Sequence, residues 1–304
     1  MNNIVNKGMN ELTKKAINES IDGLFEKDEF VLSRGSLVDL PSRENVRRII
    51  ESTKEIIYPR YFAFGAIEGR AKAEKLLEDL YELVYGEVKL AFGYDCEVCS
   101  KDKNDLNIAA RSDEIARCFI SALPKVFETL YTDIKATLAG DPAAISFDMI
   151  ILTYPGIEAV FVYRLAHLLY EKNVPLIPRM MTEYAHSKTG IDINPGAKIG
   201  SSFVIDHGTG IVIGETTEIG EHVSIYQGVT LGAISLKDSR SLVGKKRHPT
   251  ICDNVTIYAG ATILGGNTVI GEGAVIGSSV FITESVDPFV TVTMEKPKLK
   301  LIKK

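Results

Sequence analysis

The sequence of 304 residues contains few cysteines, and those it has are widely spaced: Cys96, Cys99, Cys118 and Cys252. Four scattered cysteines are too few for a disulfide framework. Cys96 and Cys99 form a C-x-x-C motif, but a zinc site would need a second pair or two well-placed histidines, and a redox site would need a βαβ context. Neither lies nearby, so we interpret them as an incidental pair and expect no metal.

The sequence also lacks a long uninterrupted hydrophobic run. Its most apolar stretch, residues 143–163, is broken by Asp148, Pro155 and Glu158, whereas a membrane-spanning helix needs about 20 apolar residues. The N-terminal segment contains no hydrophobic run of the kind found in secretory signals. We therefore expect a cytoplasmic protein with no membrane partner.

The sequence also lacks a large excess of charge of either sign. It has 35 Lys and Arg residues and 40 Asp and Glu residues, which give a net charge of −5. The positive charge is concentrated in residues 237–248 and 294–304, each with five basic residues and one acidic residue. A nucleic-acid-binding protein would need a broad basic face with stacking aromatic residues. We expect no nucleic-acid partner, since two small basic segments suit a small anionic ligand better.

The N-terminal part of the chain, up to Lys188, has the hydrophobic pattern of helices. Apolar residues recur every three or four positions, as in residues 76–84 and 115–123, which is typical of amphipathic helices. Two further helices are predicted over residues 156–170 and 176–186. Residues 1–188 are therefore expected to form a helical domain.

From residue 191 onward the hydrophobic period changes to six. A period of six is even, so each apolar anchor keeps to one face of a strand, which does not suit a helix. Short strands with glycine-rich corners predict a parallel β-helix, and a β-sandwich would need the spacing to arise by accident. The expected anchors are Ile193, Ile199, Ile205, Ile211, Ile213, Ile219, Ile225, Leu231, Ile251, Ile257, Ile263, Val269, Val275 and Phe281.

The six-residue repeat resembles the hexapeptide acyltransferases. The segments IDINPGAKIG (191–200), DHGTGIVIGETTEIG (206–220) and RHPTICDNVTIYAGATILGG (247–266), with Asp141-Pro142-Ala143 upstream, are similar to the serine O-acetyltransferase family. The resemblance implies an α+β architecture, with an all-helical N-terminal domain followed by a left-handed parallel β-helix. The expected domains are a helical domain (1–188) for oligomerisation, a catalytic β-helix (189–290) with a protruding loop (233–249), and a basic tail (291–304).

Transfer of an acetyl group to a hydroxyl needs a base, because an alcohol is a weak nucleophile at neutral pH. His207 is the candidate base, since an imidazole titrates near pH 6.5. A base also needs a group that fixes its tautomer. Asp192 precedes His207 by nearly one coil, if three hexapeptides make a coil, so we expect a His207–Asp192 dyad.

Free serine is a zwitterion, so its pocket needs a cation for the carboxylate and anions for the ammonium. Arg247 and His248 are expected to supply the first, and His248 also to help hold the tetrahedral oxyanion. Asp206 and, by the resemblance, Asp141 are expected to supply the second.

The resemblance implies acetyl-CoA as co-substrate and no permanently bound cofactor. Lys245 and Lys246 are candidates for its phosphates. Small residues leave room for its pantetheine arm, and the candidates are Gly232, Ala259, Gly260 and Gly277.

The other histidines favour structural roles: His167 on a helix, His186 near a helix end and His222 on the coil surface. A γ-class carbonic anhydrase would bind zinc through a His followed, after a long gap, by His-x4-His, a spacing that this sequence lacks. A hexapeptide acetyltransferase for homoserine or a sugar, and a non-catalytic scaffold, are the remaining alternatives.

The resemblance also implies partners. Cysteine is an expected feedback inhibitor, since it can use the same carboxylate and ammonium contacts as serine. The family assembles as trimers, often paired into hexamers, with active sites between neighbouring chains. Members that bind cysteine synthase do so through a terminal Ile, whereas this sequence ends in Lys304, so we expect that complex to be weak or absent. Its loop entrance also departs from the family's Leu-Gly-Gly-Thr, reading Leu231-Gly232-Ala233-Ile234.

Overall fold

The computed structural model describes residues 10–25, 39–63, 70–98, 107–234 and 244–295. Residues 1–39 form a unit of their own, in which helix α1 spans Glu11–Phe25. Residues 40–304 form the second unit, which holds the rest of the helical region and all the strands described below. Cys99, most of the loop 233–249 and most of the tail lie outside the described residues, as does the side chain of Cys96.

Helices come first in the described part of the second unit, and they confirm the predicted helical region. The helices predicted over 156–170 and 176–186 are α7 and α8. The bounds are α2 (Arg43–Ile57), α3 (Pro59–Phe62), α4 (Arg70–Val98), α5 (Ile108–Gly140), α6 (Phe147–Thr153), α7 (Pro155–Glu171) and α8 (Ile177–Thr189).

Local sequence explains where several of these helices begin and end. Ser42 caps α2 by accepting a hydrogen bond from the Asn45 N–H, and Asn107 caps α5 in the same way. Helix α8 ends at Gly190, whose φ of +71° is a left-handed conformation that favours glycine. Gly190 thereby turns the chain from α8 directly into the first strand.

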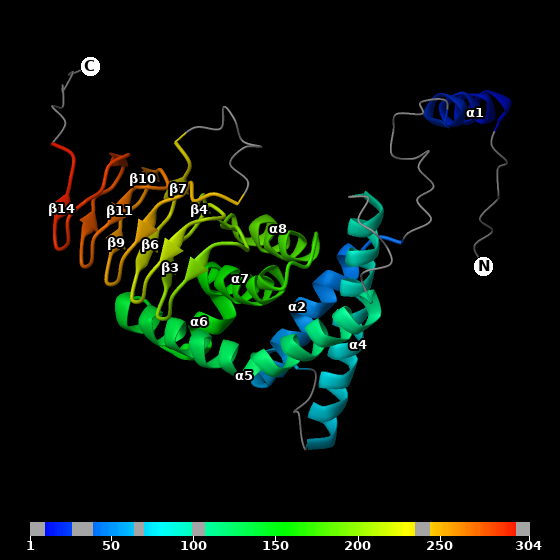
Figure 1. Ribbon diagram of the computed structural model, residues 1–304, viewed down its shortest axis with the longest axis horizontal. Coiled ribbons are helices and arrows are strands. Elements are labelled where there is room, and N and C mark those ends of the chain that lie inside the picture. Colours follow the sequence, from blue (N-terminus) through cyan, green and yellow to red (C-terminus); the bar gives the residue numbers. More distant parts are fainter. Residues whose placement is uncertain (1–9, 26–38, 64–69, 99–106, 235–243, 296–304) are drawn as a thin grey trace, which may run out of the picture. The chain divides into compact units, whose positions relative to one another are not determined.

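The strands form a parallel β-solenoid, which confirms the predicted change of architecture (Figure 1). They lie in three sheets, here called sheets A, B and C. Sheet A contains β1 (Asp192–Ile193), β4 (Val212–Ile213), β7 (Thr230–Gly232), β10 (Thr262–Leu264) and β13 (Phe281–Ile282). Sheet B contains β2 (Lys198–Ile199), β5 (Glu218–Ile219), β8 (Thr250–Ile251) and β11 (Val269–Ile270). Sheet C contains β3 (Val204–Asp206), β6 (Ser224–Tyr226), β9 (Thr256–Ile257), β12 (Val275–Ile276) and β14 (Thr291–Val292).

The spacing between stacked strands shows where residues have been inserted into the repeat. Val212 pairs with Thr230, eighteen positions further on, as expected for three hexapeptides. Asp192 pairs with Val212, twenty positions further on. Thr230 pairs with Thr262, thirty-two positions further on, because the loop between β7 and β8 is inserted there. The solenoid therefore tolerates insertions at its corners without losing strand register.

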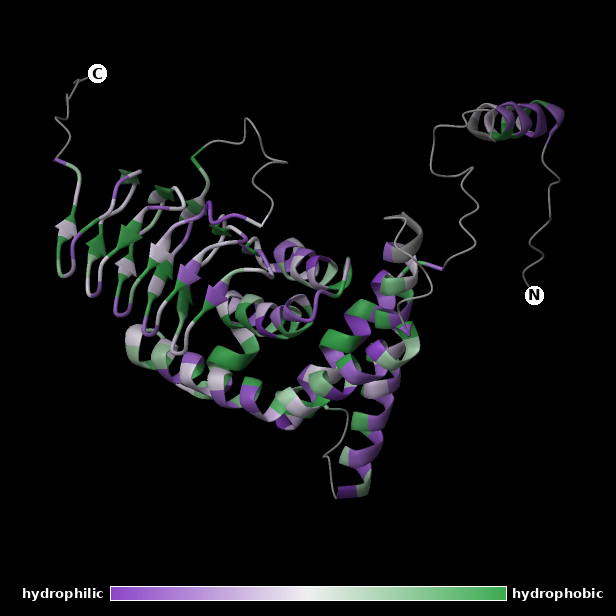
Figure 2. Cartoon of the chain, viewed as in Figure 1, coloured by the Kyte–Doolittle hydropathy of each residue, from purple (hydrophilic) through white to green (hydrophobic). Residues whose placement is uncertain are grey.

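The core of the solenoid consists of inward-facing aliphatic side chains from all three sheets. Ile205, Ile225 and Ile257, which stack on one another in sheet C, are at most 4% exposed. Figure 2 shows hydrophobic residues recurring from coil to coil along the strands. A methyl-rich interior of this kind supplies the main free energy of folding, because each fully buried Ile contributes roughly 1.5–3 kcal/mol.

Three of the predicted anchors are wrong. Phe281 and Val269 are exposed (68% and 39%), and Val275 lies on the outer face, whereas the residue after each of them faces the core: Ile270, Ile276 and Ile282. Thr250 pairs with Val269, nineteen positions further on, so one residue has been added at the corner that follows β10. Because side chains alternate along a strand, that single residue reverses every later anchor.

A buried ion pair joins the helices to the first coil. Arg164 of α7 donates from Nε and Nη2 to the carboxylate of Asp133 in α5, at 2.8 and 2.9 Å. Arg164 also donates to the carbonyl of Gly200, and Asp133 accepts from the Phe203 N–H. Burial raises the pKa of Asp133, and Arg164 opposes that effect. Helices α5 and α7 are therefore fixed to the solenoid by buried charged groups that are hydrogen-bonded to one another and to the backbone of the first coil.

Among the described helices, none is by itself long and apolar enough to cross a membrane. Helices α6 and α7 pass such a test only together, and they are bent by 74° at the break between them. Most of α7 is buried in the protein core.

Candidate active site

The predicted site residues gather at two corners of the solenoid. The CA corner is where sheet C passes into sheet A, and it comprises residues 207–211, 227–229, 259–261 and 277–280. The AB corner is where sheet A passes into sheet B, and its described residues are 214–217, 232–234, 244–249 and 265–268.

His207 projects from the CA corner because its coil contains two additional residues. Asp206 pairs with Tyr226, and Gly210 and Gly228 then occupy equivalent stacked positions. His207 and Gly208 are the two residues inserted between them. The His207 side chain is 72% exposed, and its Nδ1 lies 3.8 Å from Oδ1 of Asp206. An accessible imidazole of this kind can reach a bound substrate.

Asp141 lies close to the same corner, at the C-terminal cap of α5. Its carboxylate accepts hydrogen bonds from the Tyr154 hydroxyl (2.5 Å) and the Ala143 N–H (2.8 Å). The Tyr154 hydrogen bond, the Ala143 N–H and the charge of nearby His207 hold the pKa of Asp141 below its ordinary value of 3.8. Asp141 is therefore an anion at neutral pH.

Asp141 and Asp206 line one small recess between α5 and sheet C. The other residues lining it are Thr137, Gly140, Tyr154, Val204, Ile205, Ser224 and Tyr226. Two carboxylates at one recess beside an imidazole provide the anionic environment that an ammonium group requires.

Asp192 belongs to the same end of sheet A but does not contact His207. The Gly210 N–H donates to the Gly190 carbonyl, so β1 begins beside the coil that carries His207. Of the hydrogen bonds and ion pairs between described residues, none joins Asp192 to His207. The Asp192 carboxylate instead accepts from Arg179 of α8, with Nη1–Oδ1 at 2.9 Å. The expected dyad is thus not formed within this chain.

Glycines stack at one position along the CA corner and leave a column of backbone there without side chains. The Gly228 N–H donates to the Thr209 carbonyl and the Gly260 N–H to the Gln227 carbonyl. A Cβ built on Gly228 would lie 3.5 Å from the Cα of Gly260, so the backbones are in close contact. The Ala259 carbonyl accepts from Ser279, which follows Gly277 at the same corner. A narrow ligand can approach the backbone along this column.

The AB corner holds His248, which is 8% exposed. Its Nδ1 lies 3.0 Å from the Thr216 backbone N–H and 2.9 Å from Thr216 Oγ1. A backbone N–H can only donate, so Nδ1 accepts and the neutral ring carries its hydrogen on Nε2. Burial, with the charge of Arg247, lowers the pKa of His248 to about 4. His248 is therefore a neutral hydrogen-bond donor rather than a cation at neutral pH.

Arg247 forms an ion pair with Glu215 at the same corner. The Tyr170 hydroxyl donates to the other Glu215 oxygen at 2.8 Å. Burial alone would raise the pKa of Glu215, but the contacts from Arg247 and Tyr170 outweigh it and lower that pKa. The guanidinium is thus held in place beside His248.

The two predicted phosphate-binding lysines differ. Lys246 donates from Nζ to the carbonyls of Thr216 (2.7 Å) and Pro249 (3.2 Å), and burial lowers its pKa. It therefore fixes the base of the loop, although it is exposed, as Lys245 is. Gly232 ends β7 at this same corner.

The structure therefore divides the predicted site. His207, Asp206 and Asp141 meet at the CA corner, with Asp192 nearby, and Ala259, Gly260 and Gly277 follow along it. Arg247, His248, Lys245, Lys246 and Gly232 lie at the AB corner, at the opposite edge of sheet A. Among the described residues no hydrogen bond or ion pair connects the two groups.

Several contributors were missed by sequence reasoning. Thr216 and Glu215 stand in the GETTEIG segment, where the adjacent polar pair before a strand was an available signal. Tyr154 follows Asp141 by thirteen positions, and Arg179 precedes Asp192 by thirteen, with no local pattern to link either pair. These contacts depend on how α6 and α8 pack.

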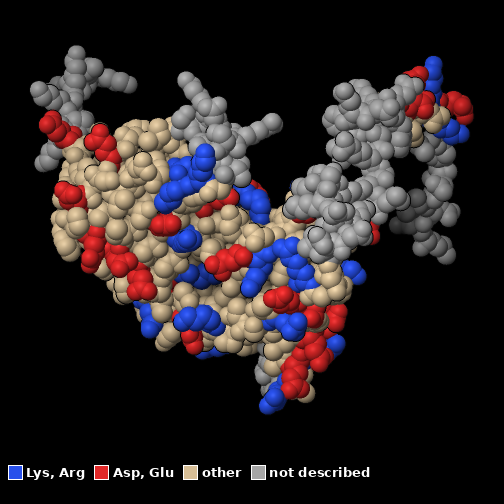
Figure 3. All heavy atoms as spheres, in the orientation of Figure 1, with Lys and Arg blue, Asp and Glu red and all other residues tan. Residues whose placement is uncertain are grey.

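The remaining histidines do not form a metal site. His167 contacts the Pro195 carbonyl through Nδ1 at 2.8 Å, and His222 is exposed on the coil surface. The one cluster of potential metal ligands among the described residues, Glu183, His186 and Asp192, contains a single histidine. On the face shown in Figure 3, Lys and Arg side chains are interspersed with Asp and Glu.

Comparison with known proteins identifies relatives, although no protein-family model matches the chain. Over 231 residues it is 42% identical to the plasmid serine acetyltransferase of Synechococcus elongatus, covering 73% of this chain and 72% of that protein. It is 48% identical over 128 residues to the serine acetyltransferase of Mycobacterium tuberculosis, spanning about half (53%) of that relative and 42% of this chain.

Solved structures give the same relationship. The crystal structure of Entamoeba histolytica serine acetyltransferase 1 in complex with L-cysteine matches with a TM-score of 0.71 and 35% identity, covering 92% of this chain and 97% of that one. A serine acetyltransferase in complex with CoA matches with a TM-score of 0.53 and 27% identity, covering 82% and 95%.

Proposed function

The chain belongs to the serine acetyltransferase family and is an acyltransferase, and from this premise we propose that it transfers the acetyl group of acetyl-CoA to the hydroxyl of L-serine. The serine oxygen attacks the thioester carbonyl carbon, the C–S bond breaks, and the hydroxyl proton passes through a base to the departing sulfur. The products are O-acetylserine and CoA with a free thiol. The reaction needs no metal, redox partner or permanently bound cofactor.

His207 is the base in this proposal, and its exposure at the CA corner supports the assignment. A base of this kind contributes on the order of 10²–10⁴ to the rate. Asp192 begins the adjacent strand and orients the imidazole in the assembled, substrate-bound enzyme. In the isolated chain Asp192 is bonded to Arg179 instead, and catalytic hydrogen bonds often tighten only in the complex.

The serine ammonium binds between Asp141 and Asp206. These carboxylates line one recess, and His207 is adjacent to it. Arg247 pairs with the serine carboxylate, since a guanidinium matches the two oxygens, and Glu215 sets its orientation. His248 donates from Nε2 to the oxyanion that forms on the acetyl carbonyl, a contribution typically worth about 10²–10³.

The site is completed between two copies of the chain, in a trimer or a pair of trimers. The separation of the two corners is the observation that supports this proposal: the base and the anionic recess lie at one edge of sheet A, whereas Arg247 and His248 lie at the other. A solenoid packed beside a second solenoid can place one copy's CA corner against the other copy's AB corner. Each interface then holds one complete set of groups.

Acetyl-CoA lies along the glycine column that begins beside His207. Ala259, Gly260 and Gly277 leave its pantetheine arm in contact with backbone. Lys245 and Gly232 of the neighbouring copy lie on the other side of the bound acetyl-CoA. Lys245 is an exposed cation that can bind a phosphate. The CoA complex of a structural relative supports the choice of donor.

Cysteine is proposed as a feedback inhibitor, because it offers the same carboxylate and ammonium with a thiol in place of the hydroxyl. The relative solved with L-cysteine supports this proposal. A cytoplasmic location remains a prediction from the sequence.

Acceptor specificity is the direct test of the proposed function. Purified full-length chain is mixed with acetyl-CoA and, separately, L-serine, L-homoserine or a thiogalactoside, and release of the free thiol is followed. We expect serine to have the highest kcat/KM, because the recess and Arg247 match its zwitterion at a fixed spacing. Turnover of homoserine or the sugar with none of serine would contradict the proposal.

A further inference from the structure

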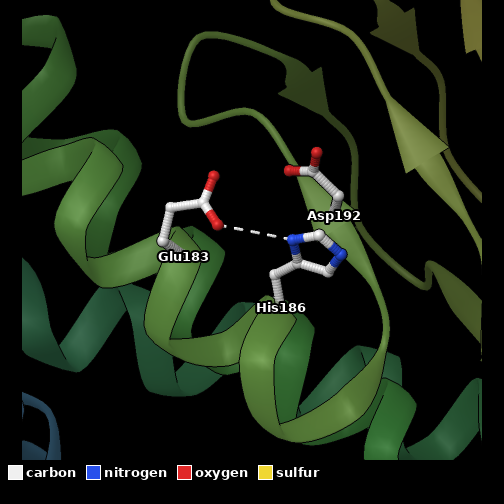
Figure 4. Close-up of side chains that lie close together, drawn as sticks. All are labelled: Glu183, His186 and Asp192. Atoms are coloured by element: carbon white, nitrogen blue, oxygen red, sulfur yellow. Dashed lines mark hydrogen bonds and ion pairs between the residues drawn. The ribbon is translucent and has the colours of Figure 1, made fainter.

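A cluster of polar side chains lies beside Asp192. Figure 4 shows Glu183 and His186 of α8 pointing toward Asp192. The nearest ligand atoms of the three residues lie within 4.8 Å of one another, and His186 Nδ1 lies 3.4 Å from Glu183 Oε2. Residues of these types could hold a metal ion. Whether they do depends on whether another positive charge already lies between the carboxylates.

Arg179 already supplies that positive charge. Its guanidinium forms ion pairs with both Glu183 and Asp192. The contact to Asp192 uses both nitrogens of the fork, with Nη1–Oδ1 at 2.9 Å and Nη2–Oδ2 at 3.5 Å. A guanidinium between two carboxylates takes the place that a divalent cation would need, so the geometry argues against metal binding.

We propose that Arg179 is a positioning residue for the acetyl transfer, which fixes the Asp192 carboxylate from the helical layer. The proposal rests on the proposed function, in which Asp192 orients His207. The planar fork of an arginine defines the positions of both carboxylate oxygens at once. Glu183 in turn holds the guanidinium through its own ion pair.

The anchoring of α8 supports this role. Arg179 stands in the first turn of α8, and Gly190, directly after α8, leads into β1, so the ion pair closes a loop of the chain onto Asp192. On its other side α8 is tied to α2, where the Tyr184 hydroxyl donates to Glu51 at 2.7 Å. The helical region therefore has a task in catalysis besides any role in assembly.

The surroundings of Arg179 also make a selective test possible. Arg179 lines a cavity of about 620 Å³ between α2 and α8, with Arg43 and Tyr184 among the other lining residues. A truncated side chain at this position therefore leaves space that a small guanidinium ion can enter. Arg43 shares the cavity without a described contact to Asp192, so it provides a matched control.

The test compares Arg179→Gln, Arg179→Lys and Arg43→Gln in the full-length enzyme, with the oligomeric state and far-ultraviolet circular dichroism checked for each. We expect Arg179→Gln to lower kcat by up to about a hundredfold, with KM for serine nearly unchanged. Arg179→Lys should retain more activity, and Arg43→Gln should match the wild type. Millimolar guanidinium chloride should restore part of the kcat of Arg179→Gln, whereas sodium chloride at equal ionic strength should not.

A double-mutant cycle separates failure of this inference from failure of the proposed function. If Asp192→Asn leaves kcat unchanged, the proposed orienting role of Asp192 is wrong. If Asp192→Asn lowers kcat but Arg179→Gln does not, only the role of Arg179 is refuted. We expect the double variant to be no slower than Asp192→Asn alone, because both changes disable one unit. Losses that multiply would also overturn the inference.

Discussion

The two corners at the edges of sheet A are made from the same six-residue repeat yet have opposite chemistry. The CA corner carries an exposed imidazole, two carboxylates and a bare glycine column. The AB corner carries a guanidinium paired with Glu215, two lysines and a buried neutral imidazole. Both differ from the plain repeat through insertions: two residues at the first, and the long loop before β8 at the second.

This difference shows how a repetitive scaffold acquires a site. The strands keep the backbone uniform, so an insertion at a corner moves only the residues within it, and functional side chains are placed there at little cost to the core. In the proposed mechanism, one chain alone presents two halves of a zwitterion-binding site, which a second copy of the chain completes.

Replacement of the proposed base in the CA corner should have the largest effect on activity. We expect His207→Ala to lower kcat by about 10²–10⁴ with little change in KM for serine, because the imidazole takes the proton only in the transition state. Steady-state kinetics of thiol release measure both constants. His222→Ala is the matched control, since His222 is also an exposed solenoid histidine, and near-normal turnover by His207→Ala would refute the mechanism.

The register of the last coils is tested by a pair of adjacent residues. Ile270 is completely buried, whereas Val269 is 39% exposed. We expect Ile270→Ala to lower the free energy of unfolding by about 2–5 kcal/mol and Val269→Ala by well under half of that. Urea unfolding at one protein concentration gives both values, and equal losses would mean that the one-residue insertion after β10 is misplaced.

The cationic half of the site is tested through substrate binding. Replacement of Arg247 by Ala removes a charged hydrogen-bond donor, worth about 1.5–3 kcal/mol. We therefore expect Arg247→Ala to raise KM for serine roughly tenfold to a hundredfold, with a smaller change in kcat. The KM for serine of Arg247→Lys should lie between those of the wild type and Arg247→Ala. A normal KM for serine in Arg247→Ala would remove the AB corner from the binding site.

The smallest expected effect concerns pH and the buried histidine. The pKa of His248 is lowered from 6.5 to about 4 in the folded protein, so the unfolded chain binds more protons between these values. Stability should therefore decrease as the pH falls from about 6.5 to about 4. Urea midpoints at a series of pH values should show this slope, and His248→Asn should flatten it. An unchanged slope would show that His248 is not buried as a neutral ring.

Much of the fold could be predicted from the sequence because the repeat is local. The change from helical spacing to a period of six, and the anchors up to Ile263, required only the alternation of side chains along a strand. The anchors after Ile263 were wrong because the single residue added near Gly265 leaves no hydrophobic mark of its own. Only strand pairing reveals such an insertion.

The candidate site residues could be picked out from the sequence, but the way they are arranged in space could not. His207 and Asp206 are neighbours in the sequence, so their proximity followed from the motif. The expected contact of Asp192 with His207 assumed a coil of three plain hexapeptides, whereas that coil is longer by two positions and the Asp192 carboxylate is bonded to Arg179 of α8. Contacts between α8 and β1 depend on tertiary packing, which spacing along the chain does not encode.

Complementation between two inactive variants tests the central claim, that CA and AB corners of different copies form one site. His207→Ala and His248→Asn should each lose at least about a hundredfold in kcat. The two chains are co-expressed with different tags, and assemblies containing both are purified and assayed. Mixed assemblies should be far more active than either parent, because some interfaces then join an intact His207 to an intact His248. Activity no higher than that of the parents would contradict the account and place each site within a single chain.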